Sequence, residues 1–133
     1  MAIDLGSFKK ALDSLDKAIR RAKAAPDDEE LRDAVIQRFE YSYELSWKSL
    51  KRVLESDAPT PEEIDSLSFK DLIRRGAEAG LVADPAEWFA FREGRNITSH
   101  TYDAGKAKAV FDTALKLAGA ARTLLIKLES RTT

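Results

Sequence analysis

The chain has 133 residues, a formal net charge of −1, 34% charged and 44% hydrophobic residues, and few Gly and Pro. This length fits one domain, residues 1–133, with a buried core, and the composition favours helices over disorder or a β-sandwich. The absence of cysteine excludes disulfides and thiolate metal sites, and the net charge argues against a protein that grips nucleic acid over its whole surface.

The amino terminus, MAIDLGSFKK, lacks the basic lead and apolar core of a signal peptide. No apolar run approaches the ~20 residues needed to span a bilayer. We therefore expect a cytoplasmic protein that does not associate with membranes. The single histidine argues against a zinc site, and we expect neither a metal nor another cofactor.

The first two predicted helices follow from the spacing of apolar residues. The first runs from Phe8 to about Ala24 with Ser7 as its N-cap, and Pro26 ends it. The second runs from Glu29 to Glu55. We interpret its aromatic residues as core or subunit interface rather than as a platform for ligand stacking. Its apolar face comprises Leu31, Val35, Ile36, Phe39, Tyr43, Leu45, Trp47, Leu50 and Leu54.

Capping residues mark three further helices. Ser68 opens a short helix that Gly80 closes, Asp84 opens a fourth helix, and Asp103 caps the last one. The apolar side of the last helix is predicted at Val110, Phe111, Leu115, Ala118, Leu125 and Leu128. These elements predict an all-α fold, an antiparallel up-and-down four-helix bundle with an additional short helix.

The segment GRNITSHTYD, Gly94 to Asp103, contains the only histidine of the chain. On one continuous helix Arg95 and His100 would point about 140° apart. Because Thr98 and Ser99 have modest helix propensity and Asp103 restarts a helix, we predict a break near Thr98 to Tyr102 that swings His100 back toward Arg95.

These residue types suit phosphodiester chemistry. Histidine exchanges protons near neutrality, and the arginine fork matches phosphate oxygens. Metal-free RNA cleavage needs a base, a cation and an acid; His100 and Arg95 are candidates for the first two. The acid is missing from one chain, and either Tyr102 or a twofold dimer can supply it. From the residues alone, a capped helix end or a surface pair remains the alternative.

Two motifs carry a family resemblance. The residues RNITSH with the following TY resemble the R-x4-H-x-Y signature of HEPN domains, the higher eukaryote and prokaryote nucleotide-binding family. The stretches VIQRFEYSYELSWKSLKRVLE and KDLIRRGAEAGLV resemble its branch of nucleotidyltransferase substrate-binding proteins. The resemblance covers about Leu5 to Leu128.

The resemblance implies a dimerising antiparallel bundle, encoded beside a minimal nucleotidyltransferase with which it forms a toxin–antitoxin pair. It also implies a metal-independent endoribonuclease with Arg95 and His100 as catalytic residues and Asn96 as a residue that orients phosphate or its neighbours. The partner would transfer AMP to Tyr102. Such an adduct places negative phosphate beside Arg95 and would compete with RNA.

Two functions remain open. The first is the regulated endoribonuclease, and the second is a non-catalytic subunit that presents nucleotide or substrate to the nucleotidyltransferase. The chain is not expected to be the nucleotidyltransferase itself, because DSLD does not match the spacing of a D-x-D pair and no P-loop is present. We interpret the basic residues near the motif as solvated charge rather than as an RNA groove. They are Arg74, Arg75, Arg92 and Lys106.

Overall fold

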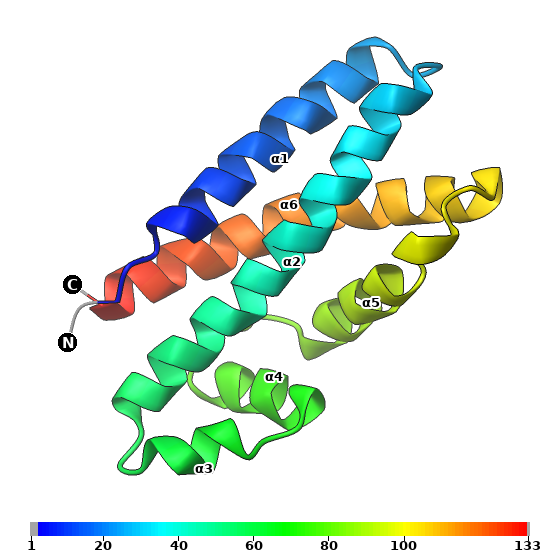
Figure 1. Ribbon diagram of the computed structural model, residues 1–133. Coiled ribbons are helices and arrows are strands. Elements are labelled where there is room, and N and C mark those ends of the chain that lie inside the picture. The colour runs from blue at the N-terminus through cyan, green and yellow to red at the C-terminus, as the bar shows by residue number, and fades with distance from the viewer. Residues whose placement is uncertain (1–2, 133) are drawn as a thin grey trace.

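The computed structural model describes residues 3–132, which form six α-helices and one 3-10 helix without any strand (Figure 1). The elements in chain order are α1 (Gly6–Ala24), α2 (Glu29–Asp57), α3 (Pro61–Asp65), α4 (Phe69–Glu78), α5 (Pro85–Asn96), η1 (Thr98–His100) and α6 (Ala104–Thr132). The predicted all-α class is therefore confirmed. None of these helices is both long and apolar enough to cross a membrane.

The long helix α2 is the centre of the bundle. It runs antiparallel to α1 and packs against α6, while its C-terminal half also contacts α3, α4 and α5 (Figure 1). The helix α5 packs beside α6. The segment between α5 and α6 therefore forms a corner at one end of these two helices, and this corner contains the R-x4-H-x-Y residues.

The core contains the aromatic residue Phe39 of α2 with no exposed surface. The buried stripe of α6 alternates alanine with larger aliphatic residues at spacings of three and four: Ala107, Val110, Ala114, Leu117, Ala121, Leu124 and Leu128. The predicted stripe was partly wrong: Val110, Leu125 and Leu128 are buried, but Phe111, Leu115 and Ala118 are only partly buried. The prediction missed Leu117 and Leu124 as well as the buried alanines, whose small side chains let α6 approach its neighbours closely.

Three predicted helix caps are confirmed. The Ser68 hydroxyl accepts a hydrogen bond from the Asp71 amide at 3.2 Å, and Asp84 Oδ1 accepts one from the Ala86 amide at 3.0 Å. Asp103 Oδ1 accepts from the Lys106 amide at 3.0 Å. These bonds satisfy amides that have no partner within the first helical turn. They fix where α4, α5 and α6 begin.

Other helix limits differ from the predictions. Ser7 lies inside α1 and is not its cap; Leu5 precedes the helix, and Asp4 Oδ1 accepts from the Gly6 amide at 2.8 Å. α2 continues to Asp57. The short helix α3 was not predicted, because the prolines indicated only an end to α2. Pro61 is instead the first residue of α3, where a missing amide hydrogen has no cost.

Candidate functional site

The helix break predicted near Thr98 to Tyr102 is confirmed. α5 ends at Asn96, the 3-10 turn η1 follows, and α6 begins at Ala104. The buried Thr98 stabilises the break because its hydroxyl donates to the Arg95 carbonyl oxygen at 2.9 Å. The His100 amide then donates to the Ile97 carbonyl at 3.0 Å, which gives η1 its tight turn.

The start of this corner is packed tightly. A Cβ atom on Gly94 would lie 3.0 Å from Thr113 Cγ2 of α6 and 3.3 Å from Phe39 Cζ of α2. Glycine at this position therefore lets α5 lie against both helices. Arg95 follows directly, so its backbone position is set by this contact.

The half-buried Arg95 side chain is held by α2 and by its own helix end. Its Nε lies 3.6 Å from Glu44 Oε1, and its Nη1 donates to Thr98 Oγ1 at 3.4 Å. Glu44 is also 3.7 Å from the Lys48 ammonium. The Nε atom is buried and has no hydrogen-bond partner within residues 3–132. The guanidinium thus has a fixed place with hydrogen-bonding capacity left over.

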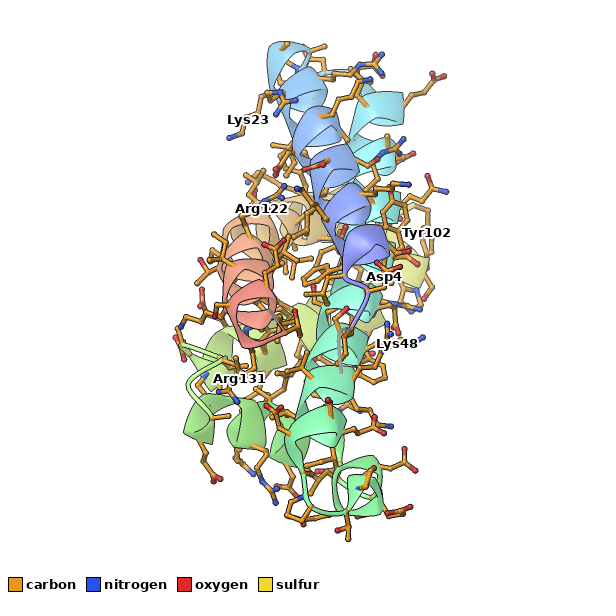
Figure 2. The ribbon with its side chains drawn as sticks, turned by 90° about the vertical axis from the view of Figure 1, so that its left-hand side faces the viewer. Asp4, Lys23, Lys48, Tyr102, Arg122 and Arg131 are labelled. Carbon is orange, nitrogen blue, oxygen red and sulfur yellow. The ribbon has the colours of Figure 1, made fainter. Side chains whose placement is uncertain are left out.

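His100 and Tyr102 lie at the exposed end of the corner. Their ring centroids are 6.1 Å apart in an edge-to-face arrangement, and Tyr102 is 85% exposed. Figure 2 shows Tyr102 and Lys48 on one side of the molecule, opposite Lys23 and Arg122. Within residues 3–132 no hydrogen bond or ion pair joins Arg95 to His100. The structure thus places the two residues on one corner, where each has its own partners: Glu44 and Thr98 for Arg95, and Tyr102 for His100.

A cavity of about 490 Å³ opens beside Arg95, between α2, α4 and α5. Two of the four predicted site residues, Arg95 and Asn96, line it; His100 and Tyr102 do not. The other lining residues come from well-separated parts of the chain: Tyr43, Glu44, Trp47, Lys51, Ile64, Leu67, Phe69, Leu72 and Arg92. The cavity therefore connects the motif arginine to surfaces outside the motif.

One wall of the cavity is aromatic and its rim is cationic. Phe69 lies between Tyr43 and Trp47, with ring centroids 6.0 and 6.3 Å away. The Arg92 guanidinium lies over the Phe69 ring at 4.9 Å. Lys51, by contrast, is committed to Asp65 through a bond of 2.7 Å. Among the three cations that line the cavity, Arg92 and Arg95 therefore have no carboxylate oxygen as close as the one that Lys51 has.

Tyr43 contributes a neutral hydroxyl to this cavity. Burial, more than any neighbouring charge, raises the pKa of Tyr43 above its ordinary value of 10.0, because the phenolate would be poorly solvated. Tyr43 is only 3% exposed, and no hydrogen bond engages its hydroxyl within residues 3–132. It therefore offers a hydrogen-bond donor rather than an acid or base at neutral pH.

Replacing Tyr43 by phenylalanine should make the protein less sensitive to alkali. Above the ordinary value of 10.0 the unfolded chain loses the tyrosine proton while the folded chain keeps it, so the free energy of unfolding falls as pH rises. Tyr43→Phe removes up to about 1.4 kcal/mol of that fall per pH unit. Urea denaturation from pH 9 to about 12 measures the slope. Tyr41→Phe is the control, and equal slopes in all three proteins would contradict the prediction.

The sequence prediction missed the cavity. Tyr43 and Trp47 were assigned to core or interface; they do pack against the core, but they also line the cavity. Among the basic residues, Arg74 pairs with Asp71, Arg75 pairs with Glu63, and only Arg92 reaches the cavity. The available signal was Arg92 and Arg95 at a spacing of three on one helix face.

The fold and the site together define a class of protein. It is an antiparallel all-α bundle with arginine, histidine and tyrosine at the corner between α5 and α6. The sequence matches the family described as nucleotidyltransferase substrate binding protein like over residues 3–130. The chain belongs to this family.

Solved structures and a curated relative agree with this assignment. HI0074 of Haemophilus influenzae, described as a substrate binding domain of a nucleotidyltransferase, is 34% identical with a TM-score of 0.89, covering 95% of this chain and 99% of that one. A Thermus thermophilus protein is 31% identical with a TM-score of 0.75, covering 91% and 98%. A probable ribonuclease HepT of Haemophilus influenzae is 50% identical over 76 residues, which are 57% of this chain and 52% of the relative. This match thus spans about half of the relative's length.

Proposed function

We propose that this chain is the HEPN toxin-like subunit of a two-component nucleotidyltransferase system, and that its homodimer is a metal-independent endoribonuclease. The observation that supports the proposal is the α5–α6 corner, which carries Arg95, held by Glu44 and Thr98, and five residues further on the exposed His100. The family match and the relative described as a probable ribonuclease support it.

In the proposed reaction the His100 imidazole takes the proton from a ribose 2′-hydroxyl. The 2′-oxygen attacks phosphorus, the bond from phosphorus to the 5′-oxygen breaks, and a 2′,3′-cyclic phosphate forms. Arg95 stabilises the negative charge that develops on the phosphate oxygens, and Asn96 helps to orient the phosphate. The leaving 5′-oxygen receives a proton and becomes a hydroxyl.

A second copy of the chain supplies that proton. Each chain has one histidine, and in an in-line displacement the attacking 2′-oxygen and the leaving 5′-oxygen lie on opposite sides of phosphorus, so one imidazole that takes the first proton does not reach the second oxygen. A twofold dimer brings the partner subunit's His100 to the cleft, together with a second arginine. A composite site does not require a hydrogen bond between Arg95 and His100, which is absent within residues 3–132, because the RNA phosphate bridges the two side chains.

Tyr102 is the proposed site of control. Its ring is 85% exposed, so a partner enzyme can reach the hydroxyl. The phenolic oxygen attacks the α-phosphorus of ATP, pyrophosphate leaves, and the phenolic proton passes to solvent. Because the Tyr102 ring lies against His100, the new AMP group occupies space beside the proposed base. Its phosphate also competes with RNA for Arg95.

Co-expression with the neighbouring nucleotidyltransferase tests the proposal. We expect intact mass and peptide mapping to place AMP on Tyr102, and cleavage of RNA in EDTA to fall in the modified protein. Tyr102→Phe should remain unmodified, and the partner should not lower its cleavage. An adduct at another residue would reject the control mechanism, and an unmodified protein that leaves RNA intact would reject the nuclease.

The cavity favours a second candidate function, a non-catalytic subunit that presents nucleotide or substrate to the nucleotidyltransferase. Its aromatic wall and two rim arginines suit a nucleotide without requiring catalysis. This function predicts a stable complex with the partner and no RNA cleavage. Failure of the two proteins to co-purify would count against it.

A further inference from the structure

We infer that the cavity between α2, α4 and α5 binds one nucleotide whose base carries an exocyclic amino group, and that this nucleotide belongs to the RNA substrate beside the scissile phosphate. The inference deepens the proposed function and rests on it through Arg95, which both sites share. A volume of about 490 Å³ lies within the usual range of small-molecule sites.

Two groups that can donate hydrogen bonds make none within residues 3–132 at this cavity. One is the Tyr43 hydroxyl, and the other is the buried Arg95 Nε, whose ion pair with Glu44 Oε1 spans 3.6 Å. Because buried polar groups in proteins almost always find hydrogen-bond partners, the Arg95 Nε indicates a place for an acceptor on a ligand. The Tyr43 hydroxyl can donate to the same ligand, which calls for acceptor oxygens or ring nitrogens.

The aromatic wall suits a nucleobase. Trp47 is partly exposed and meets Phe69 edge to face at 6.3 Å, so the two rings offer differently oriented surfaces to a flat ligand. Arg92 lies 4.9 Å above the Phe69 ring and adds a planar cation to this wall. Bases stack on aromatic rings and on guanidinium planes in single-stranded RNA sites.

The polar groups at one end of the aromatic wall determine which nucleobase fits. Glu44 presents a carboxylate to the cavity, and Asn96 presents an amide. A carboxylate accepts from the amino group of a base and repels phosphate, while an amide pairs with adenine through one donor and one acceptor. Because Glu44 Oε1 lies 3.6 Å from Arg95 Nε, the phosphate lies toward Arg92 and the Nη atoms of Arg95. Lys51 is less suited to this task because Asp65 already holds it at 2.7 Å.

Continuity with the proposed cleavage site favours RNA as the source of the nucleotide. Arg95 is both a cavity residue and the proposed cation at the scissile phosphate. A nucleotide in the cavity would therefore be joined directly to that phosphate. A free nucleotide has the same chemistry, and the experiment must separate the two sources.

The binding experiment uses the full-length chain carrying His100→Ala, so that no RNA is consumed. Titration with 5′-AMP, followed by calorimetry and by tryptophan fluorescence, should show saturable binding, because Trp47 lines the cavity whereas Trp88 is buried elsewhere. Inosine monophosphate, which lacks the amino group, should bind about tenfold more weakly. Tyr43→Phe should also weaken AMP binding about tenfold, while Tyr41→Phe, on the exposed side of α2, should not change it.

An oligoribonucleotide with 2′-O-methyl sugars, which cannot be cleaved, identifies the source. Competition between this oligonucleotide and AMP supports the RNA assignment. AMP binding without competition overturns that assignment in favour of a free nucleotide. Unchanged AMP affinity in both Tyr43→Phe and Asn96→Ala overturns the cavity site itself; Asn96, exposed at the end of α5, provides a variant with little effect on folding.

Failure of this inference is distinguishable from failure of the nuclease. Cleavage is measured on the wild-type chain with the corresponding unmodified RNA. Cleavage without AMP binding rejects the cavity site and leaves the nuclease in place. AMP binding without cleavage rejects the nuclease and leaves a nucleotide-binding subunit.

Discussion

His100→Ala is expected to lower the rate of RNA cleavage in EDTA by about 10²–10⁴-fold, the usual contribution of general acid–base catalysis. In the proposed dimer one substitution removes both the base and the acid, so the upper part of this range applies. The imidazole is exposed and its contact is with the exposed Tyr102 ring, so the fold should be unaffected.

Ser99→Ala is the matched control for this variant. Ser99 is an exposed neighbour in the same 3-10 turn and has no proposed part in the reaction. Cleavage should be near the wild-type rate in Ser99→Ala, and size-exclusion chromatography should show the same dimer in all three proteins. Cleavage by His100→Ala at the wild-type rate would end the nuclease assignment.

Phe39→Ala is expected to lower the free energy of unfolding by about 3–5 kcal/mol, the usual cost of truncating a buried aromatic side chain. Phe39 has no exposed surface, and its ring stacks with Tyr43 at a centroid distance of 6.3 Å. The Phe39 ring also packs against Gly94, the residue before Arg95: a Cβ atom on Gly94 would lie 3.3 Å from Phe39 Cζ. Because a domain of this size has a total stability of about 5–15 kcal/mol, the loss is a large part of the whole.

Urea denaturation with a fixed slope measures this loss. Phe39→Leu is the graded control, because it keeps most of the buried volume and should cost less than Phe39→Ala. A loss below about 1 kcal/mol for Phe39→Ala would mean that α2 is not packed as the structure shows. The same variant should weaken AMP binding, since Tyr43 stacks on the Phe39 ring.

Local signals were sufficient to predict most of the helices. Ser68, Asp84 and Asp103 cap helices through bonds to amides two or three residues away, and such bonds depend on neighbouring residues alone. The break near Thr98 to Tyr102 was predicted from local signals as well, namely the modest helix propensity of Thr98 and Ser99 and the cap at Asp103. The buried alanines of α6 were not, because their burial depends on how closely another helix approaches, which the sequence of α6 does not specify.

The candidate site, too, has one part that could be predicted from the sequence and one part that could not. The motif residues Arg95, Asn96, His100 and Tyr102 lie within eight consecutive positions, so their grouping was visible in the sequence. The cavity was not, because Tyr43 and Phe69 are brought together only by the packing of α2, α4 and α5. The proposed acid was also reached from the sequence, because a single histidine per chain points to a second copy of the chain.

The close contact at Gly94 has a consequence for the proposed cleavage of RNA. The end of α5 packs tightly against Thr113 and Phe39, and the turn that follows joins it to α6 through backbone hydrogen bonds of 3.0–3.3 Å. The backbone that carries Arg95 and His100 is therefore preorganised, so the entropy of ordering it is lost at folding rather than when a substrate binds. In the proposed nuclease, a substitution that loosens this contact would slow cleavage without removing any reacting group.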